Sequence, residues 1–235
     1  MKNLQHAVYL YTAKPETIDL ADTKLLNTAE QQRATAFRFD ADRTLYTAAH
    51  VFLRQTLSQH ADIAPADWQF SSNAYGKPAI TNHGYEELQF NLSHTQGLLA
   101  CAISQSRAVG VDVERHKLLH DLANLCRTAL AAPETADVLS HCGSDVRTQR
   151  FFTYWTLKEA YIKARGLGLS LPLQQFHFEQ TDAGEWHLHC QAALQDRGEN
   201  WQFLSRQVAD GYTLALAVQK VGGVNARLTI HECRR

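Results

Sequence analysis

Three acidic residues in two separate segments have the types and the spacing to bind a metal ion. Asp112 and Glu114 lie two apart in the run Gly-Val-Asp-Val-Glu, whose alternation predicts a β-strand. Side chains two apart on a strand project from one face, so both carboxylates point the same way while Val111 and Val113 point to the core. Mg²⁺ favours a few carboxylates, with waters and phosphate oxygens completing its shell. A half-buried strand with an acidic outer face is the alternative on this spacing alone.

The third acid is Glu159, in a segment whose apolar residues recur at helical spacing. The pattern predicts a helix from about Thr148 to Arg165, ended by Gly166. Its apolar stripe consists of Phe152, Trp155 and Ile162. Glu159 falls on that stripe, where a carboxylate is costly unless it is paired or binds a cation. An ordinary Glu159–Lys163 helix pair, worth roughly 0.3–0.5 kcal/mol, is the alternative.

Basic and polar groups that suit phosphate binding lie upstream of the acids. Arg43 opens a helix predicted over about Asp42–His60, and Lys77 lies in a Gly-Lys-Pro turn. Ser93 and His94 end the strand-like run Phe-Asn-Leu-Ser-His. Taken singly, each has an ordinary alternative: Lys77 as a solvated turn residue, and His94 as a satisfied histidine at a strand end.

Composition excludes several classes of function. The chain has 235 residues and a formal net charge of −1, so no overall basic field predicts nucleic-acid binding. The odd number of cysteines, with no C-x-x-C pair, indicates a reducing compartment without disulfides or a zinc site; they are Cys101, Cys126, Cys142, Cys190 and Cys233. The sequence shows neither a signal-peptide h-region nor a run of 18 apolar residues, which predicts a cytoplasmic protein with no membrane segment.

The motifs, taken in order, resemble those of a known family. Y-G-K-P, F-N-L-S-H, G-V-D-V-E and W-T-L-K-E-A-Y-I-K are similar to the motifs of the 4′-phosphopantetheinyl transferase superfamily, of the surfactin-synthetase-activating type. The resemblance runs from about Arg43 to Pro172, and weakly beyond both ends. W-x-x-K-E-A-x-x-K placed after G-V-D-V-E is quite specific, and the four motifs in order are highly so.

The resemblance implies an α/β (α+β) fold of two similar subdomains related by a pseudo-two-fold axis, each with helices packed on a small, mainly antiparallel sheet. Coenzyme A would bind in the cleft between residues 1–106, which hold its nucleotide end, and residues 107–235, which hold the magnesium and phosphate site. The strings Gly-Leu-Leu-Ala-Cys-Ala-Ile-Ser and Gly-Tyr-Thr-Leu-Ala-Leu-Ala-Val, one in each half, are faintly alike and hint at an internal duplication.

The family pattern also implies a role for each candidate residue. Asp112, Glu114 and Glu159 would bind magnesium, and Lys163 would contact the transferring phosphate. Apart from the family pattern, the chemistry calls for a base, and a carboxylate such as Glu159 could take the serine proton directly or through a metal-bound water. Arg43, Lys77, Ser93 and His94 would hold the nucleotide end, with Lys158 beside the phosphate as a structural or phosphate contact. The chain departs from the pattern before the long helix, where only Arg33 and Arg38 supply positive charge.

The implied reaction moves the 4′-phosphopantetheine group from coenzyme A to a serine of an apo-acyl or peptidyl carrier protein and releases 3′,5′-adenosine bisphosphate. A monomer needing Mg²⁺ is expected, and Mn²⁺ accepts the same ligands. Fatty-acid, polyketide and nonribosomal-peptide carriers all fit. Two alternatives are another magnesium-dependent phosphoryl-transfer enzyme, such as a nuclease, and a non-catalytic module that binds coenzyme A or a carrier protein.

Overall fold

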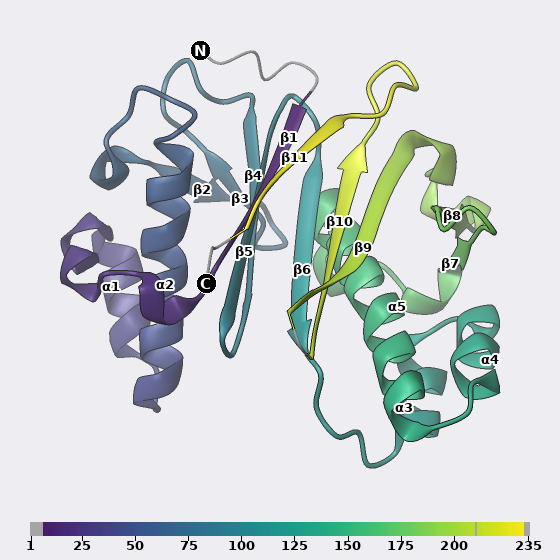
Figure 1. Ribbon diagram of the computed structural model, residues 1–235. Helices are drawn as coiled ribbons and strands as arrows, with labels where there is room; N and C mark the ends of the chain where they lie inside the picture. The colour runs from purple at the N-terminus through teal and green to yellow at the C-terminus, as the bar shows by residue number, and fades with distance from the viewer. Residues whose placement is uncertain (1–6, 210, 233–235) are drawn as a thin grey trace.

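Helices and strands follow one another in two successive runs with the same order (Figure 1). The computed structural model describes residues 7–209 and 211–232. The first run comprises β1 (Ala7–Ala13), α1 (Thr28–Thr35), α2 (Asp40–Leu57), β2 (Phe70–Ser72), β3 (Pro78–Ile80), β4 (Leu88–Thr95) and β5 (Leu98–Gln105). The second comprises β6 (Val109–Arg115), α3 (Leu122–Ala129), α4 (Ala132–Ser140), α5 (Ser144–Arg165), β7 (Phe176–Gln180), β8 (Trp186–Cys190), β9 (Trp201–Ala209) and β10 (Tyr212–Gln219).

The strand pairing is repeated as well. In the first half the order is β1-β5-β4 and in the second it is β6-β10-β9, and each half adds a two-stranded hairpin, β2-β3 or β7-β8. The pairs within each run are antiparallel. The two similar strings of the sequence fall on β5 and β10, which hold the same central place. This repetition confirms the predicted α/β fold of two similar halves.

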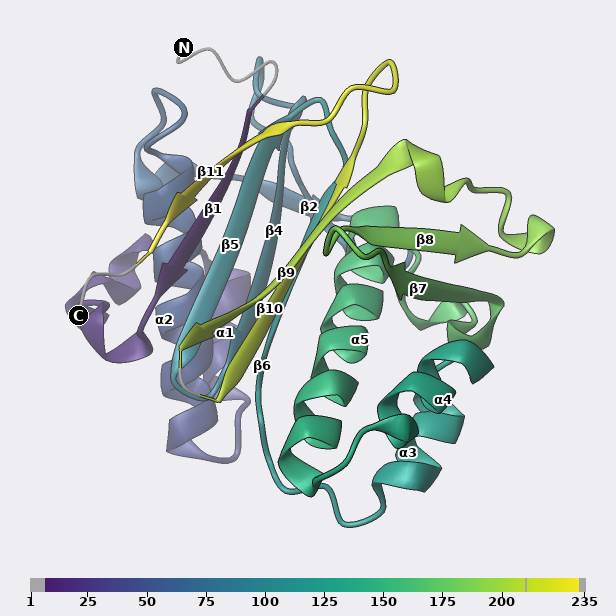
Figure 2. The same cartoon turned by 45° about the vertical axis from the view of Figure 1, so that its right-hand side comes forward.

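The two sheets face each other, and one long helix covers the outer face of each (Figures 1 and 2). Period-2 alternation explains the layers: Ala100 and Ala102 of β5 join the core between the sheets, whereas Leu99 and Cys101 pack toward α2. On β6, Val111 and Val113 lie in the same central core, as the sequence predicts. The opposite face of β6 is therefore free to carry the acidic pair toward α5.

A last strand, β11 (Arg227–His231), was not predicted from the sequence. It pairs in parallel with β1, so the end of the chain completes the sheet of the first half. Arg107, at the junction of the halves, is buried and donates Nη1 to the carbonyls of Gln219 and Val224. These bonds hold the segment that leads from β10 to β11.

Other differences from the sequence pattern have local causes. The segment between β6 and α5 forms two helices, because the chain leaves α3 at Leu130 and restarts with Pro133 in the first turn of α4. Phe39 is the N-cap residue of α2, and Asp40 and Asp42 lie in its first turn. Four cysteines are free thiols and Cys233 lies outside the described residues. Within residues 7–209 and 211–232, no helix has the length and apolarity to span a membrane.

Candidate active site

A cleft opens where the edge strands β4 and β6 of the two sheets meet beneath α5. Side chains from all three elements line it: Leu92, Ser93 and His94 from β4, Asp112, Val113 and Glu114 from β6, and Trp155, Glu159 and Lys163 from α5. We call this the interdomain cleft. A second pocket shares Glu159 and Lys163 with it and reaches the turn around Lys77. The structure thus brings together the three acids, Lys163, Ser93 and His94.

Side chains of β4 join the two halves at the floor of this cleft. Asn91 Oδ1 accepts a hydrogen bond from the backbone N–H of Val111 at 2.8 Å, and Ser93 Oγ accepts one from that of Val113 at 3.3 Å. Two such bonds, two residues apart on each strand, fix the register of β4 against β6. Asn91 was not predicted as a site residue, although the alternation of polar and apolar residues in Phe-Asn-Leu-Ser indicates a polar face.

Asp112 is the most buried of the three acids, with 4% of its surface exposed. Its Oδ1 accepts hydrogen bonds from Ser93 Oγ at 3.0 Å and from Lys163 Nζ at 2.6 Å, and Lys163 also donates to Ser93 at 3.0 Å. Lys163 therefore pairs across the cleft with Asp112, not along the helix with Glu159. The ordinary helix pair considered as the alternative for Glu159 is not the pair that forms.

The other two acids are half-buried beside Asp112. Burial raises the pKa of Glu159, and the charge of Asp112 raises it further. The pKa of Glu114 is raised by the same two causes, against a hydrogen bond with Trp155 that lowers it. Three carboxylates thus share one region with Lys163 as their common positive neighbour, an arrangement that favours binding of a cation or uptake of a proton.

The donor set fits a hard divalent cation. Asp112 Oδ2 is buried and has no hydrogen-bond partner among the described residues, and an orphaned carboxylate oxygen requires a partner. All three acids offer oxygen, the ligand that Mg²⁺ prefers. Among the described residues, no group of three or more acidic, histidine or cysteine side chains is arranged to hold a metal ion, and the Lys163 ammonium lies against Asp112. Substrate phosphates would have to complete a magnesium site.

The close approach of α5 to β6 places Glu159 and Lys163 in the cleft. Gly110, two residues before Asp112, makes this approach possible: a Cβ built there would lie 2.0 Å from the carbonyl oxygen of Ala160 and 2.4 Å from the backbone nitrogen of Ala164. Because these neighbours are backbone atoms, no side chain can move aside to make room for the added Cβ. The glycine of Gly-Val-Asp-Val-Glu is therefore a packing requirement of the site.

We expect Gly110→Ala to lower the free energy of unfolding by about 3 kcal/mol or more, because an overpacked backbone contact must push α5 away from β6. Urea unfolding of the variant and the wild type measures the loss. Gly84→Ala is the control: it has a positive φ but nothing within 4 Å of the added Cβ, so it reports backbone strain alone, about 1 kcal/mol. Equal losses in the two variants would contradict the packing argument.

Lys158 does not reach the cleft, which corrects its assignment as a phosphate contact. Its side chain is fully buried, and Nζ lies 2.9 Å from Glu134 Oε2 and donates to the carbonyls of Leu173 and Phe176 at 2.8 and 2.7 Å. All three ammonium donors are thus satisfied. Glu134 in turn accepts from the backbone N–H of Phe178 at 2.9 Å. Lys158 fastens α5 to α4 and to the start of β7.

Lys77 lies at the second pocket but uses its ammonium on protein groups. It donates to the carbonyl of Ala164 at 2.8 Å and to that of Val109 at 3.3 Å, and burial lowers its pKa to about 8. Asn73 Nδ2 donates to the carbonyl of Gly166 at 2.8 Å. The Gly-Lys-Pro turn therefore satisfies the last carbonyls of α5. A contact between Lys77 and phosphate stays a prediction, as does one from Ser93, which is bound to Asp112.

The last two candidate residues, His94 and Arg43, are both exposed. His94 is exposed at the rim of the interdomain cleft, where loss of solvent contact, then His50, then Lys163 lower its pKa. Arg43 lies at the start of α2, exposed, with Nη2 2.8 Å from Asp40 Oδ1. Arg43 lines a separate hollow between α1 and α2 with Lys24 and Thr44, so the structure does not place it among the acids.

Comparison with known proteins agrees with this geometry. Residues 108–217 match the family model of the 4′-phosphopantetheinyl transferase superfamily, and residues 13–106 match the model of a 4′-phosphopantetheinyl transferase N-terminal domain. The 4′-phosphopantetheinyl transferase HetI of Nostoc sp. is 32% identical over 78% of this chain and 83% of its own. The chain belongs to the 4′-phosphopantetheinyl transferase superfamily.

Further relatives carry related names. The 4′-phosphopantetheinyl transferase Sfp of Bacillus subtilis is 29% identical over 80% of this chain and 78% of its own. The solved holo-(acyl-carrier-protein) synthase of Bacillus anthracis, in complex with CoA (3′,5′-ADP), covers 48% of this chain and 94% of its own, at 18% identity and a TM-score of 0.39.

Proposed function

We propose that the interdomain cleft transfers 4′-phosphopantetheine from coenzyme A to a serine of an apo-carrier protein, with Asp112, Glu114 and Glu159 holding Mg²⁺. The observation that carries this assignment is the convergence of the three acids and Lys163 from β6 and α5 on one cleft in a chain of this superfamily. The alternative of a nuclease is disfavoured, because the chain has a net charge of −1 and therefore no overall positive charge to attract nucleic acid. A non-catalytic binding module would not need the full acidic set.

The chain's own residues supply a consistent set of roles. The serine oxygen bonds to the β-phosphorus of coenzyme A, and the bond from that phosphorus to the bridging oxygen breaks, releasing 3′,5′-adenosine bisphosphate. Lys163 donates to the phosphate oxygens where negative charge increases. Glu159, whose pKa is raised by burial and by Asp112, accepts the serine proton. When bound, Mg²⁺ would neutralise pyrophosphate charge.

Asp112 orients Lys163 as well as contributing negative charge. Its bonds to Ser93 and Lys163 fix the lysine at the junction of β4, β6 and α5. Arrival of the phosphates gives Lys163 a second anion to contact, and positioning of this kind supplies much of the rate in phosphoryl transfer. The reaction needs no covalent intermediate with the protein.

The deciding experiment incubates the chain with coenzyme A, Mg²⁺ and an apo-carrier protein and weighs the carrier by mass spectrometry. We expect a mass gain of one phosphopantetheine group, lost when the carrier's serine is replaced by alanine. Acyl and peptidyl carriers tested in parallel give the preferred partner. A carrier of unchanged mass with every carrier class tested would refute the proposed reaction.

Metal binding should release protons. Glu114 and Glu159 have pKa values raised above the ordinary carboxyl value, so part of the population is protonated in mildly acidic solution, and Mg²⁺ binding requires the ionised form. We expect Mg²⁺ affinity, in the presence of coenzyme A, to rise with pH through the mildly acidic range, because the raised pKa values move ionisation of these groups above its ordinary range. Calorimetry in two buffers of different ionisation enthalpy counts the protons released. An affinity independent of pH, with no proton release, would contradict the assignment.

A further inference from the structure

The chain crosses between the two halves twice, and both crossings lie at the same end of the sheets (Figure 1). The first crossing, residues 106–108, leads from β5 to β6, and the second, residues 220–226, leads from β10 back to β11 in the sheet of the first half. The strand registers place them together, because Val109 at the start of β6 pairs with Val218 at the end of β10. The two halves are therefore joined covalently at this end alone.

Arg107 of the first crossing is bonded to the second. Only 1% of its surface is exposed, and its Nη1 donates to the carbonyl of Gln219 at 3.2 Å and to that of Val224 at 3.0 Å. Ser104 Oγ, near the end of β5, donates to the carbonyl of Arg107 at 2.6 Å and fixes its backbone. One guanidinium thus bridges the two crossings.

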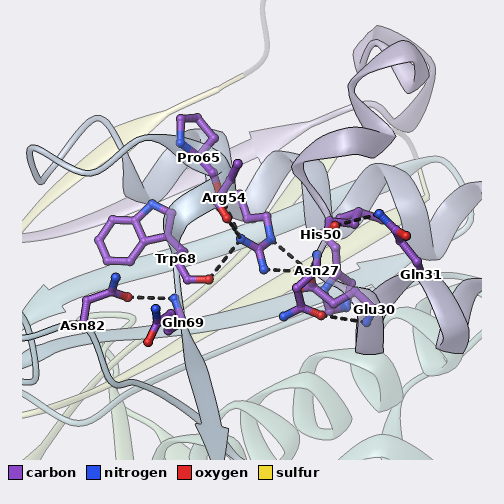
Figure 3. Close-up of polar contacts among 11 residues, drawn as sticks. Asn27, Glu30, Gln31, His50, Arg54, Pro65, Trp68, Gln69 and Asn82 are labelled. Atoms are coloured by element: carbon purple, nitrogen blue, oxygen red, sulfur yellow. Dashed lines mark hydrogen bonds and ion pairs between the residues drawn. The ribbon is translucent and has the colours of Figure 1, made fainter.

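A comparison with another buried arginine, Arg54, shows what Arg107 lacks (Figure 3). Arg54 donates from Nε and Nη2 to the carboxylate of Glu30 at 3.0 and 2.7 Å, and from Nη1 to the carbonyls of Pro65 and Trp68. Its charge is neutralised and its donors are occupied. Among the described residues Arg107 has no carboxylate partner, and its Nε is buried without a hydrogen-bond partner.

A guanidinium buried in this way is a poor contributor to stability. Burying a charge without an opposite charge costs free energy, and an apolar side chain of similar volume is often as stable or more so. The two residues whose carbonyls accept from Arg107, Gln219 and Val224, are themselves exposed, so these carbonyls can turn to water if the arginine is removed. What Arg107 contributes is therefore the fixed geometry of the two crossings.

That geometry controls where β6 lies in the interdomain cleft. From Val109 to Glu114 the strand extends about 16 Å, so a rotation of about 4° at the crossings moves Glu114 by about 1 Å. A displacement of this size can cost about a hundredfold in rate where reacting groups must be aligned. At the far end of the cleft, the bonds from Tyr212 Oη and Arg115 Nη1 to Gln96 are exposed to solvent, whereas the bridge made by Arg107 is buried.

We infer that Arg107 is a positioning residue, which bridges the two crossings and thereby holds β6 against β4, with Asp112 aligned on Ser93. The apolar core between the sheets is non-directional, so it resists separation of the halves without fixing this alignment. The alignment is a property of the fold, whereas its effect on transfer rests on the proposed function. The sequence motifs do not include Arg107.

Amide hydrogen exchange, followed by NMR, measures whether β6 stays on β4. The N–H groups of Val111 and Val113 donate to side chains of β4, and strand alternation turns the N–H of Asp112 between them toward β10. In Arg107→Met we expect Val111 and Val113 to exchange about tenfold faster, the equivalent of one charge-assisted hydrogen bond, and Asp112 to exchange at the wild-type rate. Unchanged exchange at Val111 and Val113 overturns the inference.

Turnover with an apo-carrier protein, at saturating coenzyme A and Mg²⁺, measures the consequence for the reaction. We expect kcat of Arg107→Met to fall about tenfold or more, although the variant should melt at or above the wild-type temperature because a buried charge is gone. Arg107→Lys, whose ammonium can donate to both carbonyls, should recover most of the exchange protection and of the turnover. Faster exchange with normal turnover overturns the positioning role, whereas a wild type that modifies no carrier overturns the proposed function and leaves the exchange result standing.

Two further variants separate alignment from general stability. Leu57→Val, in the core between α2 and its sheet, lowers overall stability and should leave the ratio of the Val111 and Asp112 exchange rates unchanged. Ser104→Ala removes the bond that fixes the backbone of Arg107, and it should speed exchange at Val111 in the same direction by a smaller factor. If Arg107→Met does not fold, Ser104→Ala decides, and unchanged exchange at Val111 in that variant overturns the inference.

Discussion

Asp112→Asn should reduce phosphopantetheine transfer by about a thousandfold or more while the protein stays folded. The substitution keeps the size of the side chain and an oxygen for Ser93, but it removes the charge that faces both the metal position and Lys163. Loss of a charged group at a metal and phosphate site costs several kcal/mol of transition-state stabilisation. Turnover with an apo-carrier protein measures the effect.

Stability should change little in this variant. The Asp112–Lys163 pair is partly exposed on the lysine side, at 28%, so its loss should cost about 1 kcal/mol or less. Asparagine is preferred to alanine because Asp112 is buried, and alanine would leave Ser93 without its acceptor. Asp62→Asn, at an exposed position, is the control. Turnover within a few-fold of wild type in Asp112→Asn would remove Asp112 from the site.

Short-range periodicity predicted the parts of the site that depend on one element alone. Alternation put Asp112 and Glu114 on the face of β6 opposite Val111 and Val113, and helical spacing put Glu159 on the inner side of α5. The same periodicity separates the two lysines: Lys163 is one turn from Glu159, whereas Lys158 is its neighbour and points about 100° away around the helix. The family motif grouped them, but the helix period already favoured Lys163 for the cleft.

Contacts between residues far apart in the sequence could not be predicted from local periodicity. The ammonium of Lys77 reaches a carbonyl 87 positions further along the chain, and nothing near Lys77 in the sequence indicates that contact. Glu134 pairs with Lys158 only because α4 packs on α5. Likewise β11 is short and becomes a strand through pairing with β1 at the other end of the chain. Tertiary contacts decided each of these cases over local propensity.

Glu159→Gln should abolish most of the stabilisation that Mg²⁺ and coenzyme A give together, and should cut turnover by orders of magnitude. A ligand that binds only the folded state raises the melting temperature, so the wild type should show a clear shift. In the variant one of three carboxylates no longer carries charge toward the ion, and the shift should be much smaller. Differential scanning fluorimetry with and without both ligands measures it, with Glu185→Gln, at an exposed position, as the control.

The ligand-free protein gives the second half of this test. The pKa of Glu159 is raised by burial and by Asp112, so its charged form is disfavoured in the fold, and the neutral glutamine should leave the ligand-free chain as stable as the wild type or more so. The direction of the change in melting temperature separates a functional carboxylate from a structural one, because breaking a stabilising ion pair would lower the melting temperature instead. Lys163 already pairs with Asp112, so it does not depend on Glu159 for a partner. If Glu159 serves the reaction, Glu159→Gln should melt at the same or a higher temperature without ligand and show a smaller melting shift with Mg²⁺ and coenzyme A. Equal melting shifts in the variant and the wild type, together with normal turnover, would make Glu159 an ordinary helix residue.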